Sequence, residues 1–511
     1  MTLALLGIDI GTSGCKALLL GVDGQILAAR TALYVVMSPK PGWSEQDPET
    51  WVNGVRTAIG EVLAAQPDVE ILAIGLSGQM HGLTALNAQG EVLRSAILWN
   101  DQRGAEEGQA ITTALGGLNG LLAETNNQML SGYTGSKIRW MRNHEPALFE
   151  RLRHVLNPKD YLRYRLTGEF ATEVSDASGT GLFNVRRRQW SKPVIAATGL
   201  DADCLPPCFE STEVSGRVSP LGARLFGLPV GIPVVGGGGD AVVQTLGAGV
   251  IHPNEVQSTI GTAGVLACVL ATDTPNPDGR LQVFCNVVPD SWHCMGVTLN
   301  AGSALAWLRK TIEKLAGLSN GEECQISYER LLECAAKSPV GANGLIFLPY
   351  LHGERCPYPD PHARGSFIGL TNRHTENDII RSVLEGVVFS LKDISLLMAQ
   401  IGVNYSRILA SGGGARSGFW RQTQADVFGC EVATTSGAAE GGALGAAFIA
   451  GLGTGVWTNA QEAVSCCQTL QVETPHQPTT KHYKRLFEIY HHLYGMLSES
   501  FSALAALQLD D

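Results

Sequence analysis

The sequence of 511 residues lacks an excess of positive charge and lacks long apolar runs. Lysine and arginine number 37 against 48 aspartates and glutamates, which gives a net charge of −11 at pH 7. An acidic chain without basic clusters is a poor partner for nucleic acid or anionic membranes. The most apolar stretch, Gly441–Trp457, is too short and too rich in glycine to span a bilayer. We therefore expect neither a nucleic-acid nor a membrane partner.

The sequence also lacks the cysteine spacings that are typical of zinc sites. Its 12 cysteines are scattered, and the only close ones are Cys204 with Cys208 and the adjacent Cys466 and Cys467, to which the sequence assigns no role. No CxxC pair or histidine cluster accompanies them, so zinc is not expected. The first residues show neither the basic start nor the cleavage site of a signal peptide. Reduced thiols and this start predict a cytoplasmic protein.

No GxxxxGK[ST] motif is present, so a Walker-type phosphate loop is excluded. A different stretch predicts a β-hairpin, because the apolar runs Leu5–Ile10 and Ala17–Leu20 flank the glycine-bounded turn Gly11–Gly14. A carboxylate beside backbone N–H groups and hydroxyls can bind a metal ion on one side and phosphate on the other. The alternative is an ordinary hairpin whose aspartate only ends a strand. The polar residues in question are Asp9, Thr12, Ser13 and Lys16.

The same pattern returns about 250 positions later, in Gln257–Leu270, where Gly261–Gly264 aligns with Gly11–Gly14. Two such hairpins indicate an internal duplication. The length also suits two domains rather than one core. We therefore expect related domains over residues 1–250 and 251–511, each offering one hairpin to a shared phosphate site.

Polar residues follow two predicted strands, where α/β proteins usually bind ligands. The strand Ile71–Leu76 leads into Ser77–Gly82, and the strand Val92–Leu98 leads into Trp99–Arg103. A lone loop histidine is more often structural, yet a small ligand suits this mixture of polar and apolar groups. The candidate contacts are Gln79, Met80, His81, Trp99 and Asp101.

The strongest single site is the run of four glycines Gly236–Gly239, followed by Asp240 where a helix is predicted to begin. Glycine at this density permits close approach of a ligand to the backbone. Asp240 either caps the helix or takes a proton from an attacking hydroxyl, as a positioned carboxylate does in phosphoryl transfer. The segment Val174–Gly181, by contrast, is interpreted as an ordinary loop. A second glycine loop, Gly412–Ala415, lies between a predicted strand and helix and is a candidate nucleotide loop.

These hairpins and glycine loops resemble the actin-like ATPase fold shared by sugar kinases and heat-shock chaperones. Within that fold the sequence is similar to the FGGY family of carbohydrate kinases, and the resemblance spans nearly the whole chain. Among the family's members, the sequence is most similar to those that act on D-xylulose. SGQMHG is the most specific part of the resemblance, because glycerol kinases carry a different segment there. The matching segments are SGQMHG at Ser77–Gly82, LWND at Leu98–Asp101, PKDYLR at Pro158–Arg163, GGGD at Gly237–Asp240, LPYLHGER at Leu348–Arg355 and GGGARS at Gly412–Ser417.

The resemblance implies an α/β fold of two duplicated actin-like (ribonuclease H-like) domains with a central cleft, the first binding sugar and the second nucleotide. It further implies ATP-dependent phosphorylation of D-xylulose to D-xylulose 5-phosphate, with Asp240 as catalytic base and Asp9 binding Mg²⁺ through water. Met80 and His81 would contact the sugar, together with Gln79, Trp99 and Asp101. Contacts to phosphate and nucleotide are implied for Gly11, Thr12, Ser13, Lys16, Gly261, Thr262, Gly302, Gly413, Gly414 and Ala415.

Two departures from the family pattern leave alternatives open. Ala241 stands where the family usually has asparagine or glutamine, which puts the identity of the sugar in question, and Ala263 stands where serine is common. One alternative is a kinase of the same fold for ribulose, gluconate or a glycerol-like polyol. Another is an actin-like nucleotide switch, which would need a separate partner-binding domain, and a third is a silent sugar sensor, which would be expected to lack Asp240. Sugar and ATP are the expected partners, and a homodimer stays open.

Overall fold

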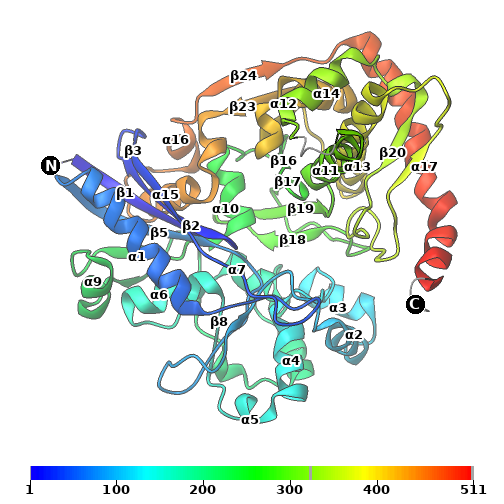
Figure 1. The fold of residues 1–511 in the computed structure, drawn as a ribbon. Coiled ribbons are helices and arrows are strands. Elements are labelled where there is room, and N and C mark those ends of the chain that lie inside the picture. Colours follow the sequence, from blue (N-terminus) through cyan, green and yellow to red (C-terminus); the bar gives the residue numbers. More distant parts are fainter. Residues whose placement is uncertain (1, 321–324, 508–511) are drawn as a thin grey trace. The chain divides into compact units, whose positions relative to one another are not determined.

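The computed structural model describes residues 2–320 and 325–507, which form two compact α/β units (Figure 1). Unit 1 comprises residues up to 251 together with 269–294 and 436–468. Unit 2 comprises residues 252–268, 295–435 and those from 469 onward. In the described part of the chain, no helix combines the length and the apolar character that crossing a membrane requires.

Unit 1 contains a mixed sheet built around its first strand. β1 is antiparallel to β2 and parallel to β5, and its core-facing residues, such as Leu6 and Ile8, are fully buried. The predicted hairpin and the strand that follows it are therefore confirmed. In spatial order the strands are β13 (Val214–Arg217), β14 (Pro233–Val235), β5 (Val69–Gly78), β1 (Thr2–Ile10), β2 (Gly14–Gly21) and β3 (Ile26–Leu33), and β15 (Gly238–Gly239) also pairs with β5.

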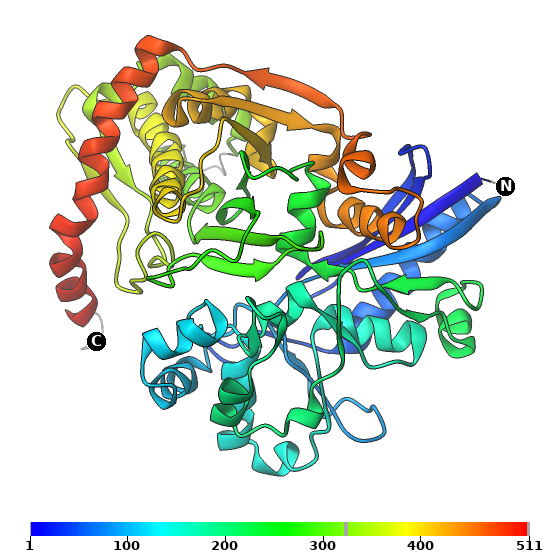
Figure 2. The same cartoon turned by 180° about the vertical axis from the view of Figure 1, so that it is seen from behind.

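Two helices cover this sheet, α1 (Pro48–Ala65) on one face and α15 (Gly441–Gly453) on the other, as Figures 1 and 2 show. α1 begins with proline directly after Asp47, whose side chain accepts the N–H of Glu49. Proline suits the first helical position because its missing N–H would have no partner there. The sequence of α1 thus specifies both its start and its apolar face.

α15 approaches the sheet unusually closely because the residues that meet, glycines on the sheet and alanines on the helix, are small. A Cβ added to Gly7 in β1 would lie 1.9 Å from the carbonyl oxygen of Ala443, and one added to Gly75 in β5 would lie 1.9 Å from that of Ala446. α10 (Asp240–Gly247) packs against α15 in the same way, since a Cβ on Gly445 would lie 2.2 Å from a backbone oxygen of α10. The small residues of α15 thus allow close packing on both sides of the helix.

The other elements of unit 1 lie mainly between β5 and β14 in the chain. They are β4 (Glu45–Gln46), β6 (Thr84–Leu86), β7 (Ala96–Ile97), α2 (Ala105–Ala114), α3 (Leu118–Thr125), α4 (Thr134–His144), α5 (Pro146–Phe149), β8 (His154–Leu156), α6 (Pro158–Thr167), β9 (Thr172–Glu173), α7 (Val174–Gly179), β10 (Phe183–Asn184), β11 (Gln189–Trp190), α8 (Lys192–Thr198), η1 (Ala202–Cys204), β12 (Cys208–Phe209), α9 (Pro220–Phe226), β18 (Gln282–Cys285), η4 (Ser436–Ala439) and α16 (Ala460–Val464).

Unit 2 repeats the arrangement seen around β1. β16 is antiparallel to β17 and parallel to β22, just as β1 is antiparallel to β2 and parallel to β5. Its sheet contains, in spatial order, β19 (Trp292–Thr298), β17 (Gly264–Leu270), β16 (Glu255–Ile260), β22 (Arg407–Ser411), β23 (Glu431–Thr435) and β24 (Thr469–Glu473). The remaining elements are α11 (Gly302–Asn320), α12 (Tyr328–Lys337), η2 (Ala342–Gly344), β20 (Ile346–Leu348), β21 (Ser366–Ile368), α13 (Glu376–Gln400), η3 (Gly413–Arg416), α14 (Gly418–Phe428) and α17 (Gln477–Leu507).

Two local predictions are wrong. Val174–Gly179 is a helical segment, α7, rather than a loop, because Glu173 accepts the first N–H groups of the helix. The predicted strand Val92–Leu98 shrinks to β7, which forms a two-residue ladder with β4 and a single bridge between Ile97 and Leu83.

Candidate functional site

The turn of the first hairpin is fixed by hydrogen bonds from several elements of unit 1. The N–H of Gly11 donates to the carbonyl of Gly14 over 2.9 Å. Tyr34 Oη donates to the carbonyl of Gly11, and Gln46 Nε2 donates to that of Thr12, each over 2.8 Å. The glycine-rich turn therefore has a defined backbone conformation, as a phosphate-binding turn requires.

Asp9 lies at the end of β1, partly buried between β5 and the start of α15. Ser77 Oγ, from β5, donates to Asp9 Oδ1 over 2.7 Å. A Cβ added to Gly442 of α15 would lie 2.6 Å from Asp9 Cγ and Oδ2. Burial raises the pKa of Asp9, and the hydrogen bond from Ser77 and the positive charge of Lys16 oppose this rise. Lys16 itself pairs with Glu440 over 3.1 Å.

Asp240 is the first residue of α10 and does not cap that helix. The capping residue is Gly239, so the interpretation of Asp240 as an N-cap is wrong. Asp240 Oδ1 accepts only the N–H of its neighbour Ala241, over 2.7 Å, among the bonds seen in the described residues. Burial, followed by the negative charge of Asp9, raises the pKa of Asp240 to about 7.

The two carboxylates are brought together by the end of β5. In the parallel pairing of β15 with β5, Gly238 lies opposite Ser77 and Gly239 lies opposite Gly78. Ser77 also lies opposite Asp9 in the parallel pairing of β5 with β1. Like charges held near each other favour a cation between them or a shared proton. A carboxyl group with a pKa near 7 can accept a proton at neutral pH, as a general base must.

Met80 and His81 follow β5 and lie beside the glycine loop. Met80 is buried, and a Cβ added to Gly239 would lie 2.5 Å from Met80 Cγ. His81 adopts a positive φ of 67° and stacks on Tyr133 with 4.5 Å between ring centroids. Its Nδ1 lies 2.5 Å from the carbonyl oxygen of Gly179, so Nδ1 carries the proton of the neutral ring and Nε2 carries the lone pair.

The positive φ of His81 is stabilised by α4. Thr134 Oγ1 and Lys137 Nζ both donate to the carbonyl oxygen of His81, over 3.1 and 2.8 Å. A non-glycine residue in this region costs about 1–3 kcal/mol and persists only where its surroundings impose it. The imidazole of His81 is therefore held in one position next to Met80 and the loop that carries Asp240.

Of the three other predicted sugar contacts, two lie at the hairpin turn and one is buried in an ion pair. Gln79 Nε2 donates to the carbonyl of Gly11, and Trp99 Nε1 donates to Thr12 Oγ1 over 2.9 Å, so both side chains lie at the hairpin turn. Asp101 is fully buried and pairs with Arg103 over 2.8 Å. Their contact with a sugar stays a prediction.

The turn of the second hairpin is joined to the start of α11 within unit 2. Gly302 N–H donates to the carbonyl of Gly261 over 2.8 Å, and Ala301 N–H donates to that of Thr262 over 3.1 Å. A Cβ on Gly302 would lie 2.5 Å from the carbonyl oxygen of Gly261, so glycine is required there. The beginning of a long helix beside a glycine turn is favourable for an anion.

The loop after β22 lies against the end of β16. Gly412 has a φ of 75°, and a Cβ added to it would lie 2.7 Å from the carbonyl oxygen of Ile260. A Cβ added to Gly414 would lie 2.6 Å from Ile260 Cβ. The structure thus brings Gly413, Gly414 and the adjoining Ala415 to the strand that precedes Gly261. Their contact with a nucleotide stays a prediction.

The two hairpins differ in one chemical respect. Thr259 occupies the position in β16 that Asp9 occupies in β1, and it pairs with Ser411 as Asp9 pairs with Ser77. The hydroxyls of Thr259 and Ser411 lie 2.6 Å apart. Only the hairpin of unit 1 therefore carries a carboxylate at this position.

Sequence reasoning missed Ser77 and Ser175 as parts of the site. Ser77 contacts Asp9, and Ser175 Oγ accepts the N–H of Gly239 over 3.0 Å. A serine at a strand end has no distinctive pattern, and Ser175 lies in the segment that was interpreted as a loop. The PKDYLR motif contains charged residues that lie behind this loop, but by itself it indicates only the family resemblance.

Comparison with known proteins covers both units. The sequence models for the N-terminal and C-terminal domains of the FGGY family of carbohydrate kinases match residues 4–247 and 256–454. A xylulose kinase of Escherichia coli K12 is 38% identical over 482 residues, which is 94% of this chain and 95% of that protein. The crystal structure of xylulose kinase from Rhodospirillum rubrum has a TM-score of 0.89 at 30% identity and covers 98% of this chain and 100% of that chain.

A gluconate kinase from Lactobacillus acidophilus is also similar, with a TM-score of 0.91, 26% identity and coverage of 99% of this chain and 100% of that chain. The predicted actin-like ATPase fold is confirmed by these likenesses to sugar kinases. The family models match most of both units, and a relative is more than 30% identical over nearly the full length. These matches assign the chain to a single family. The chain belongs to the FGGY family of carbohydrate kinases, which transfer a phosphoryl group from ATP to a sugar.

Proposed function

We propose that this chain phosphorylates D-xylulose to D-xylulose 5-phosphate, using Asp240 as general base. The substrate class is supported by the 38% identity to a protein named xylulose kinase. The single observation that carries the mechanism is Asp240, a partly buried carboxyl group with a pKa of about 7, which directly follows the glycine that packs against Met80. At neutral pH such a group accepts the proton of a sugar hydroxyl as that oxygen attacks the γ-phosphorus of ATP.

His81 and Met80 orient the sugar in this proposal. The imidazole of His81 forms a hydrogen bond with a sugar hydroxyl, while Met80 supplies an apolar wall next to Gly239. A site that hydrogen-bonds a hydroxyl discriminates strongly against analogues that lack it. We assign Gln79, Trp99 and Asp101 to the same sugar-binding region of residues 1–250.

Asp9 is the proposed residue for Mg²⁺. Mg²⁺ takes one or two carboxylates, retains several waters and completes its shell with substrate phosphates. Asp9 fits this requirement because it is a partly buried carboxylate whose pKa is raised, and a cation would relieve the cost of its charge. Bound there, the ion would supply positive charge to the transferred phosphoryl group. Within their own units, the phosphate and nucleotide contacts are assigned to Gly11, Thr12, Ser13, Lys16, Gly261, Thr262, Gly302, Gly413, Gly414 and Ala415.

A gluconate kinase is the second candidate, since one solved example shares the fold at 26% identity and Ala241 removes a polar side chain next to the base. A coupled assay of ADP release against D-xylulose, D-ribulose, gluconate and glycerol separates the two. We expect D-xylulose to give the highest kcat/KM. A higher value for gluconate would overturn the substrate assignment and leave the kinase class intact.

The variant Asp240→Asn tests the base. It preserves the size of the side chain and removes its ability to accept a proton, so kcat should fall by about 10²–10⁴-fold. Because Gly239 rather than Asp240 caps α10, the helix keeps its cap in this variant. Retention of more than about a tenth of the wild-type kcat would move the base away from Asp240.

A further inference from the structure

Five charged side chains are buried behind the glycine loop, and the proposed chemistry uses none of them. We name them the buried charge cluster: Lys159, Asp160 and Arg163 from α6, Glu173 at the end of β9 and Asp176 in α7. Each is at most 1% exposed. Lys159 Nζ lies 2.5 Å from Asp160 Oδ1, 3.5 Å from Asp176 Oδ2 and 3.7 Å from Glu173 Oε1. Burying charges is costly, so a cluster of this size indicates a function beyond stability.

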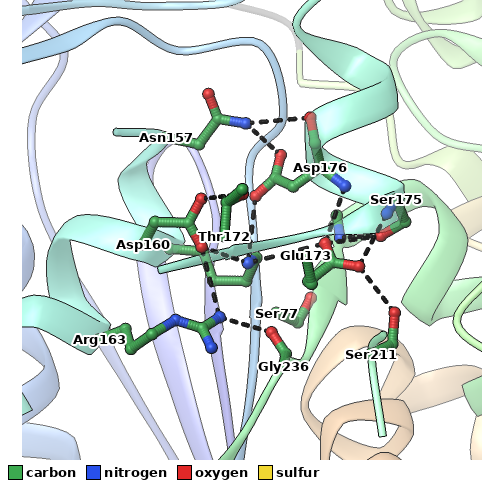
Figure 3. Close-up of polar contacts among 12 residues, drawn as sticks. Ser77, Asn157, Asp160, Arg163, Thr172, Glu173, Ser175, Asp176, Ser211 and Gly236 are labelled. Carbon is green, nitrogen blue, oxygen red and sulfur yellow. Dashed lines mark hydrogen bonds and ion pairs between the residues drawn. The ribbon is translucent and has the colours of Figure 1, made fainter. Parts of the chain in front are cut away.

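Arg163 connects the buried charge cluster to the beginning of the glycine loop. Arg163 donates to the carbonyl oxygen of Gly236 over 2.5 Å and to that of Val235 over 3.2 Å, and Figure 3 shows its guanidinium directed at Gly236. Its other partner within the cluster is Asp160, at 3.3 Å. The guanidinium therefore fixes the two carbonyl groups at which the chain leaves β14.

Ser175 connects the buried charge cluster to the end of the glycine loop. Ser175 Oγ donates its proton to Glu173 Oε1 over 2.8 Å and accepts the N–H of Gly239 over 3.0 Å. Glu173 is in turn fixed by Ser211 Oγ, at 2.7 Å (Figure 3), and by the charge of Lys159. Because the single hydroxyl proton is directed to a carboxylate, the lone pairs of Ser175 face Gly239.

The loop cannot fix its own conformation, because four glycines have no side chains and many accessible backbone states. Glycine is nevertheless required, since a Cβ on Gly237 would lie 2.1 Å from the carbonyl oxygen of Leu76. External contacts must therefore set the direction in which Asp240, the next residue after Gly239, leaves the loop. The strand β5 pairs with Gly238 and Gly239, and Ser175 provides the side-chain contact to the N–H of Gly239.

We propose that Ser175 is a positioning residue for phosphoryl transfer. Its hydroxyl, oriented by Glu173, fixes the N–H of Gly239 and so fixes the carboxylate of Asp240 relative to the sugar hydroxyl. The inference rests on the proposed role of Asp240 as the base. A displacement of a catalytic group by about 1 Å can cost 10²-fold in rate, so one hydrogen bond at this position has a large effect.

The test compares Ser175→Ala with Ser178→Ala, a matched control on the same helix. Ser178 is buried, and its hydroxyl accepts the N–H of Cys285 over 3.1 Å, so both variants leave one buried N–H group without its partner. We expect similar decreases in melting temperature. Only Ser175→Ala should lower kcat, by about 10- to 100-fold with an unchanged KM for the sugar. Equal kcat values in the two variants would overturn the proposal.

Two further measurements separate this inference from the proposed base. In an Asp240→Asn background, adding Ser175→Ala should cause no further loss of kcat, because the group that Ser175 positions is already absent. A further loss of 10-fold or more would show that Ser175 acts by another route and would refute the positioning role. An active Asp240→Asn enzyme would instead refute the proposed base. If Ser175→Ala does not fold, Ser175→Cys retains the volume with a much weaker acceptor and is expected to show the same selective loss of kcat.

Discussion

The substitution Gly442→Ala is a sharp test of the role of Asp9. The added methyl group would lie 2.6 Å from Asp9 Cγ and Oδ2 and 2.8 Å from Oδ1, whereas ordinary contact begins at 3.4 Å. α15 cannot move away from the sheet as an isolated piece, because its backbone also contacts the glycines of β1 and β5 at Gly7 and Gly75. The carboxylate of Asp9 must therefore move instead.

The required movement follows from these distances. The difference between 3.4 and 2.6 Å is a displacement of about 0.8 Å, which also disturbs the 2.7 Å bond from Ser77 to Asp9. Overpacking of this kind costs about 1–3 kcal/mol of stability. A shift of a catalytic ligand by nearly 1 Å costs up to about 10²-fold in rate.

The assay is kcat measured as a function of Mg²⁺ concentration at saturating sugar and ATP. We expect Gly442→Ala to lower kcat by about 10- to 100-fold and to raise the Mg²⁺ concentration at half-maximal rate. Gly60→Ala is the control, because a Cβ at that exposed helical glycine meets nothing within 4 Å. It should raise stability by about 0.4–1 kcal/mol and leave kinetics unchanged. A Gly442→Ala enzyme with wild-type rate and Mg²⁺ dependence would refute the assignment of Asp9.

Three further results are expected. The value of kcat/KM should rise with pH through about 7 and then level off, because only deprotonated Asp240 accepts a proton, and a rate that is flat between pH 6 and 8 would contradict this. The contribution of Asp240 to stability should fall as pH rises from 3.8 to about 7, since the pKa of Asp240 is raised in the folded state, so Asp240→Asn should unfold at a higher temperature than the wild type above pH 7 but not below pH 3.8. His81→Ala should raise KM for the preferred sugar and narrow the differences among sugars in the panel, whereas an unchanged ranking would remove His81 from the sugar site.

The fold could be predicted from the sequence in those segments whose local residue pattern favours the same structure as their pairing with distant parts of the chain. The hairpin around Gly11–Gly14 has two apolar strands and a glycine turn, and the structure confirms it. α7 was missed because Ser, Asp and Gly dominate Val174–Gly179, and these residues favour turns in isolation. The helix forms because Glu173 is fixed by Lys159 and Ser211, both distant in sequence.

The candidate site was predictable in its residue types but less so in its contacts. Asp240 stood out because four glycines precede it, yet sequence could not show that Gly239 takes the cap. Gln79 and Trp99 were grouped with the sugar contacts by their positions after strands, and the structure places their polar atoms at the hairpin turn. Partners 67 to 87 positions apart leave no local pattern, so such contacts need coordinates.

The pairing of Thr259 with Ser411 has a consequence for how a duplicated chain evolves. It occupies the same strand register as the pair of Asp9 and Ser77, yet it carries no charge. The shared backbone geometry therefore accepts either an ionised or a neutral pair at this point. One copy can specialise for a cation while the other stays neutral, so the division of labour between the repeats requires a change in a side chain rather than a new fold.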